Sequence, residues 1–142
     1  MGFGEALRLL AIRAGVELSA REQTGVDDLY RINQLATSFF REALESPEGG
    51  RAMEYLKRRG VDDQTRNLFA LGYSPNKPDS LQSHLAFHGV TRDLAFNVGL
   101  IQRFEDGGTR DFFRGRLMFP ICDNRGRVTG FGARALDDGM PK

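Results

Sequence analysis

The sequence predicts an α+β fold, with N-terminal helices followed by a small antiparallel sheet that ends in a C-terminal hairpin. Before Leu100, apolar side chains recur at the three- and four-residue spacing of helices. After it, "LIQRF" and "GRLMFPICD" alternate with a period of two, and the glycine-rich turns "EDGG" and "DNRG" follow them. Helices that precede strands, rather than alternating with them, are typical of an α+β arrangement.

Two helices are expected in the first third of the chain. Residues 4–14 show helical periodicity, and residues 16–27 lose it, so they are interpreted as a linker. A second helix is expected to start near Asp28, because one apolar stripe continues from there. Its members are Leu29, Ile32, Leu35, Ala36, Phe39, Ala43 and Leu44.

Shorter helices are expected next. Ser46 and Pro47 are residue types that open a helix, here about 47–59, and Gly60 is suited to end it. Two similar helix-turn units follow, "GVDDQTRNLFALGY" (60–73) and "GVTRDLAFNVGL" (89–100). Between them, Asp79 is expected to cap a helix that continues through His88.

Charge is distributed unevenly, although the net charge is only +1. Residues 110–142 contain seven Lys or Arg and four Asp or Glu, whereas residues 1–109 contain thirteen and fifteen. Six of these arginines lie in "RDFFRGRLMFPICDNRGRVTGFGAR" (110–134). Such a local excess is typical of an anion-binding face and, equally, of a solvated strand surface.

The arginine-rich stretch is expected to form two strands. On the first, Arg114 and Arg116 project to one side. The other side is expected to pack on the helices through Leu117, Phe119 and Ile121. The returning strand carries Arg134, and a row of arginines can follow a sugar–phosphate chain. The alternative is an edge hairpin whose arginines serve solubility.

A family resemblance favours the nucleic-acid interpretation. The segment "FFRGRLMFPICDNRGRVTGFGARALDDGMPK" strongly resembles a motif of bacterial DnaG-type DNA primases, R-F-R-x-R-[LIV]-M-F-P-I-x-D-x-x-G-x-V-x-G-F-G-G-R followed by proline-lysine. "FGEALRLLAIRAGVEL" and "EYLKRRGVDDQTRNLFALGYSP" are similar, in the same order, to earlier segments of that family. The resemblance covers nearly the whole chain and departs from the motif at Phe112, Cys122 and Ala133.

The resemblance also implies site residues. Family positions that contact the single-stranded template correspond here to Arg59, Arg114, Arg134 and Lys142, and Arg116 matches a further basic position. It implies that residues 1–27 are a helix and linker that follow a zinc-binding domain. Residues 28–142 then form the N-terminal subdomain of the RNA-polymerase core.

The implied function is that of a DNA primase, a nucleotidyltransferase that makes short RNA primers on single-stranded DNA. This subdomain would guide the template strand, with the RNA primer, toward a Mg²⁺ site outside the chain, and the isolated chain would be inactive. No cofactor is expected here, because the resemblance assigns Mg²⁺ to a Toprim region and Zn²⁺ to an N-terminal ribbon. A replicative helicase would bind only through a further domain.

The sequence is also compatible with other functions. A protein-interaction or scaffold module, and a double-stranded DNA binder that uses residues 60–73 and 89–100, remain alternatives. His84 and His88 have zinc-compatible spacing but no evident third ligand, so no metal site is expected. The single cysteine, Cys122, favours a cytoplasmic setting, here the bacterial nucleoid or replisome, and no apolar run suggests a membrane segment.

Overall fold

The computed structural model describes residues 20–136, with side chains from residue 27 onward. Helices predominate up to residue 97, and antiparallel strands follow from residue 101 to the C-terminal hairpin, which confirms the α+β fold. One strand of the main sheet, residues 72–74, nevertheless comes before the last two helices. The elements are α2 (Ala20–Glu45), η1 (Pro47–Gly49), α3 (Gly50–Arg58), α4 (Asp63–Leu68), β1 (Gly72–Ser74), α5 (Ser80–Phe87), α6 (Arg92–Asn97), β2 (Ile101–Arg103), β3 (Thr109–Asp111), β4 (Arg116–Cys122) and β5 (Val128–Ala135).

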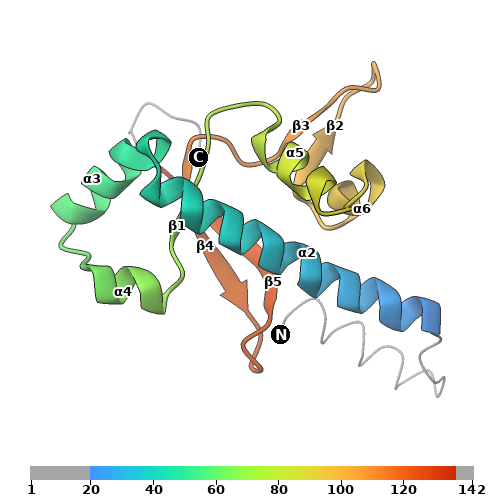
Figure 1. Ribbon diagram of the computed structural model, residues 1–142, viewed down its shortest axis with the longest axis horizontal. Coiled ribbons are helices and arrows are strands. Elements are labelled where there is room, and N and C mark those ends of the chain that lie inside the picture. Colours follow the sequence, from blue (N-terminus) through green and yellow to red (C-terminus); the bar gives the residue numbers. More distant parts are fainter. Residues whose placement is uncertain (1–19, 137–142) are drawn as a thin grey trace.

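The long helix α2 crosses the molecule (Figure 1). Helices α3 and α4 lie toward one of its ends, whereas α5, α6 and the β2–β3 hairpin lie together on another side of the molecule. A three-stranded antiparallel sheet, in the order β1-β4-β5, packs against α2. Among the described residues, no helix combines the length and the apolar character that a membrane crossing needs.

Helix α2 begins at Ala20, so the expected linker over 16–27 is wrong from that residue onward. Residues 1–19, including the first expected helix, lie outside the described residues. The stretch from Ala20 to Gln23 contains only strong helix formers, and a single interior glycine such as Gly25 costs about 1 kcal/mol. A long helix that is anchored by packing from Leu29 onward tolerates that cost.

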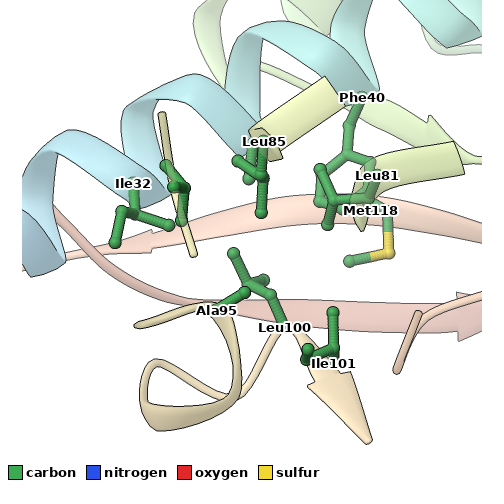
Figure 2. Packing of buried hydrophobic residues seen from close by; sticks show 10 residues of the cluster. Ile32, Phe40, Leu81, Leu85, Ala95, Leu100, Ile101 and Met118 are labelled. Carbon is green, nitrogen blue, oxygen red and sulfur yellow. The ribbon is translucent and has the colours of Figure 1, made fainter. Parts of the chain in front are cut away.

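The larger core cluster lies between α2, α5, α6, β2 and β4 (Figure 2). Phe131 of β5 meets the ring of Phe40, a buried member of this cluster, edge-on at 5.3 Å between centroids. Gly72 of β1 passes so close that an added Cβ would lie 2.6 Å from atoms of Phe40. The buried members are Ile32, Ala36, Phe40, Leu81, Leu85, Val90, Ala95, Leu100, Ile101 and Met118.

A second core cluster joins the end of α2 to α3, β1 and β4. Ala52 and Leu56 project from one face of α3 and pack with Leu117 of β4. This packing holds α3 against the face of the sheet that carries Leu117. The buried members are Ala43, Leu44, Ala52, Leu56, Tyr73 and Leu117.

Strand β4 differs from the expected alternation. Leu117 is buried as expected, but Phe119 and Ile121 are 39% and 50% exposed, so the expectation that they pack on the helices is wrong. On the opposite face of β4, Met118 is buried and belongs to the larger core cluster. On the face of β4 that carries Leu117, the second core cluster covers only the start of the strand. Farther along this face, the Phe119 ring lies over Gly132 of β5.

Both short helix-turn units form as the sequence predicts. Gly60 and Gly89 have positive φ angles of 75° and 82° and end the preceding helices. The amides of the next residues, Val61 and Val90, each donate at 2.9 Å to a carbonyl of the last helical turn. Each following helix has a side-chain cap, in which Asp62 accepts from Thr65 and Thr91 accepts from Leu94.

Candidate nucleic-acid interface

Two of the predicted template residues meet on one tyrosine, although they are far apart in sequence. The Arg134 Nε atom of β5 donates a 2.7 Å hydrogen bond to the Tyr55 hydroxyl of α3. The Arg59 guanidinium carbon lies 5.3 Å from the centroid of the same ring, in cation–π contact. We call Arg59, Tyr55 and Arg134 the α3–β5 cluster. Sequence reasoning missed Tyr55, because no local pattern shows that it contacts β5.

Local chemistry explains why α3 presents these groups. Tyr55 and Arg59 are four residues apart, so they are neighbours on one helix face. Buried Leu56 packs into the second core cluster, against which Tyr55 is also partly packed, and this packing fixes the orientation of the helix. Gly60 then ends the helix with its positive φ angle. The cations therefore gather in the last helical turn, where the helix dipole favours positive charge.

Further exposed positive charge lies next to Arg59 in the sequence. Lys57 and Arg58 precede Arg59 and are exposed, as are Arg59 and Arg134 themselves. Within the part of the chain that the structure describes, none of these four cations forms an ion pair. By contrast, Arg66 of α4 bridges to Asp63 at 2.9 Å. Cations without acidic partners are available to an external anion.

Arg114 and Arg116 do not share a strand face as expected. Strand β4 begins only at Arg116, and Arg114 lies in the connection before it. Gly115 between them has φ +65°, and its amide donates to the Ser74 carbonyl at 2.7 Å. The Arg116 amide then donates to the Ser74 hydroxyl at 2.9 Å. The connection is thereby fixed against the end of β1.

The register of the sheet separates Arg116 from Arg134. Arg116 pairs with Ala135, and Leu117 pairs with Arg134. Because paired residues project to the same face, Arg116 and Arg134 lie on opposite faces at the same end of the sheet. Arg134 shares its face with α3, whereas Arg116 shares its face with Ser74. Lys142 lies outside the described residues.

A buried carboxylate supports the chain just before Arg114. Asp111, 1% exposed, accepts hydrogen bonds from the amides of Leu81 at 2.7 Å and Gln82 at 2.9 Å, at the start of α5. It replaces the expected cap Asp79, whose side chain accepts no such bond. Burial raises the pKa of Asp111 to about 6, although both amides and nearby Arg114 lower it.

The remaining polar candidates have structural partners. The rings of His84 and His88 lie 4.7 Å apart, and Phe39 lies 5.0 Å from His84. Burial, and then His88, lower the pKa of His84. Among the described residues, no group of three His, Cys, Asp or Glu is placed to hold a metal ion.

Comparisons with known proteins bear on this arrangement directly. The family described as "DNA primase catalytic core, N-terminal domain" matches residues 39–142. The chain belongs to this family.

A DNA primase of Deinococcus radiodurans is 43% identical over 144 residues, which cover 100% of this chain and 24% of the relative. A DNA primase of Geobacillus stearothermophilus is 36% identical, with 99% and 25% covered. The chain therefore spans about a quarter of the length of these curated relatives.

Solved structures of primase catalytic domains share the fold. One, a DnaG primase catalytic domain bound to ssDNA, superposes with a TM-score of 0.79 at 32% identity, covering 84% of this chain and 39% of that one. Another is the RNA polymerase domain of Mycobacterium tuberculosis primase DnaG in complex with a double-stranded DNA oligomer with a 6-nucleotide overhang. Its TM-score is 0.76 at 34% identity, with 82% and 36% covered. The resemblance to primases is thus confirmed.

Proposed function

We propose that this primase-core domain holds single-stranded template DNA during the synthesis of short RNA primers, and that the α3–β5 cluster is its principal phosphate contact. The observation that carries the proposal is the contact of Arg59 and Arg134 with Tyr55, because it holds two exposed guanidinium groups against one tyrosine side chain. A fixed guanidinium loses less entropy on binding a phosphate than a freely moving one.

The chain's own contribution is positioning. Arg134 and Arg59 bind backbone phosphates on the face of α3, and Arg114 and Arg116 extend the contact around the end of the sheet. Lys142 is proposed to continue the same track beyond Ala135. Phosphoryl transfer depends mainly on such positioning and on electrostatic stabilisation.

Metal chemistry is proposed to lie in other parts of the full-length primase. The described residues offer no cluster that fits Mg²⁺ or Zn²⁺, so no step of the reaction is derived from them. We assign Mg²⁺ to a Toprim region and Zn²⁺ to an N-terminal ribbon, and a replicative helicase to a further domain. Residues 28–142 are proposed as the template-guiding subdomain, and residues 1–27 as its connection to the ribbon. The proposed location is the nucleoid, at the replication fork.

Binding of labelled single-stranded DNA, followed by fluorescence anisotropy at increasing salt, tests the proposal. The five proposed phosphate contacts predict a log–log salt slope near −3.5, from about −0.7 for each contact. Arg59→Ala and Arg134→Ala should each weaken binding and reduce the slope by about 0.7 in magnitude.

A matched control uses Arg125, an exposed arginine in the β4–β5 turn. This turn lies at the end of the sheet opposite to Arg134, so Arg125→Ala should leave the slope unchanged. No binding at low salt would favour a scaffold role. Preference for a fully paired duplex would favour the double-stranded alternative. Equal losses for all three variants would show that only diffuse charge is involved.

A further inference from the structure

The β2–β3 hairpin carries an exposed aromatic face that the α3–β5 cluster does not use. The register pairs Gln102 with Arg110, and the amide of Phe112 extends this ladder with a 2.9 Å bond to the Leu100 carbonyl. Beyond β2, the Phe104 amide bonds to the Gly108 carbonyl at 2.9 Å. Positions 104, 110 and 112 therefore lie on one face of the hairpin. We call Phe104, Arg110 and Phe112 the hairpin face.

This face combines accessible rings with an available cation. The Phe104 and Phe112 side chains are 42% and 50% exposed. The Arg110 guanidinium carbon lies 4.9 Å from the centroid of the Phe104 ring. Arg110 is exposed and, in the described part of the chain, forms no ion pair.

The opposite face of the same hairpin provides an internal comparison. There, Arg103 lies 4.2 Å from the centroid of the Phe96 ring, and the 40% exposed Phe96 resembles Phe104 in accessibility. Arg103, however, forms an ion pair with Asp93. One arginine–phenylalanine pair is therefore neutralised by a neighbouring carboxylate, whereas no described residue neutralises the pair on the hairpin face.

The exposed rings are also held in place. Phe113 is partly buried against the main core cluster, and the Phe112 ring packs edge-on against it at 4.8 Å between centroids. A positioned ring needs little further ordering when it binds a flat partner. The hairpin tip beyond Phe104 carries Glu105 and Asp106, so an anionic ligand would be confined to the base of the hairpin.

We propose that the hairpin face stacks unpaired bases of a nucleic-acid strand whose phosphates contact Arg110 and Arg114. This inference rests on the proposed function and specifies how the strand continues beyond the end of the sheet. The connection from Arg110 to Arg116 joins the hairpin to β4, so the two contact regions are adjacent along the chain. Aromatic rings with neighbouring arginines are the combination that binds single strands without sequence preference. A paired duplex hides its base faces and would not stack here.

Two labelled single-stranded oligonucleotides of about 12 nucleotides test the proposal with the 142-residue chain, one with thymine bases and one abasic throughout. The wild-type chain should bind the thymine strand at least about fivefold more tightly. The double variant Phe104→Ala/Phe112→Ala should lose this preference and bind the abasic strand as the wild type does. The double variant Phe104→Leu/Phe112→Leu keeps apolar side chains without aromatic rings and should also lose the preference for the thymine strand. This variant tests the proposal if the alanine variant unfolds. Phe96→Ala is the matched control and should retain the preference for the thymine strand.

The outcomes separate this inference from the proposed function. If Arg134→Ala weakens binding of both strands but the wild type shows no preference for bases, the hairpin-face proposal is wrong and template binding stands. The same conclusion holds if the preference survives in the leucine variant or disappears in Phe96→Ala. If the wild type binds neither strand at low salt, both proposals are wrong.

Discussion

At the scale of single residues, Tyr55 makes two different contacts through one side chain. Its hydroxyl accepts the Arg134 hydrogen bond, and its ring lies beneath the Arg59 guanidinium. The two contacts can be removed separately, because phenylalanine keeps the ring and loses only the hydroxyl.

Tyr55→Phe is expected to weaken single-stranded DNA binding by a few-fold, because Arg134 loses a hydrogen bond worth about 1 kcal/mol that fixes its orientation. Tyr55→Ala should weaken binding further, since Arg59 also loses its support. Anisotropy titration and thermal melting measure both effects. Tyr30→Phe serves as the control, because the buried Tyr30 hydroxyl has no hydrogen-bond partner among the described residues. Wild-type affinity of Tyr55→Phe, or an equal loss of affinity in Tyr30→Phe, would contradict the role of the α3–β5 cluster.

Asp111 predicts a specific dependence of stability on pH. Its pKa is about 6 in the folded chain, above the ordinary value of 3.8, so the folded state binds the proton more tightly than the unfolded state. The contribution to the free energy of unfolding is therefore complete below about pH 4 and is lost as pH rises to about 6. The largest loss is about 3 kcal/mol.

Denaturant titrations of the wild type and Asp111→Asn between pH 4 and 7 measure this contribution. The variant cannot ionise, so the wild type should lose stability relative to it over this range. A constant difference at all pH values would contradict the expected ionisation. Asp62 is a useful contrast, because hydrogen bonds from the backbone amide and the side chain of Thr65 lower its pKa. Its contribution is present above about pH 4 and is lost as pH falls.

At the scale of elements, β4 shows how a single strand can bury both of its faces unequally. Near its start, Leu117 packs on α3 and Met118 packs on α2, whereas farther along the partly exposed Phe119 ring lies over Gly132 of β5. Helices α2 and α3 cover different lengths of β4 on its two faces, so both faces are buried only along the part of the strand that both helices cover.

This arrangement predicts opposite costs for two adjacent substitutions. Met118→Ala should lower the free energy of unfolding by about 2–5 kcal/mol, because it leaves a cavity in the main core. Phe119→Ala should cost much less, because the ring is already 39% exposed. Chemical denaturation of both variants measures the difference. If Phe119→Ala proves the more destabilising, the burial pattern described for β4 is wrong.

At the scale of the whole molecule, two core clusters hold the α3 side and the hairpin side against one helix and one sheet (Figure 1). The candidate contacts therefore lie on a scaffold with fixed spacing. The same scaffold recurs in primase catalytic domains, of which this chain covers 39% in one case.

The isolated chain is expected to synthesise no primer when it is supplied with template, nucleotides and Mg²⁺. Primer synthesis requires metal-assisted phosphoryl transfer, and the described residues provide no cluster of metal ligands. Incorporation of labelled ribonucleotides measures the activity. The same residues joined in one polypeptide to the remaining catalytic core should be active, and Arg134→Ala in that longer protein should reduce the activity. A template-dependent product from the purified 142-residue chain would contradict this expectation.

The sequence alone determined the features that depend on neighbouring residues. Helical spacing predicted the apolar stripe of α2, Gly60 predicted the end of α3, and alternation predicted the C-terminal strands. The start of α2 at Ala20 was not predicted, because the apolar periodicity that indicates a helix is lost over residues 16–27. These features are local, and hydrogen bonding within a few residues specifies them.

Only the tertiary structure decided which groups meet across long separations. Arg134 contacts Tyr55 at a separation of 79 residues, and Asp111 rather than Asp79 caps α5 from 30 residues away. Likewise, a register that pairs Arg116 with Ala135 places Arg116 and Arg134 on opposite faces. A shift of register by one residue would exchange these faces without changing the sequence pattern of either strand. The packing of α2 and α3 against the sheet selects one register, and so only the folded chain determines which arginines can act together.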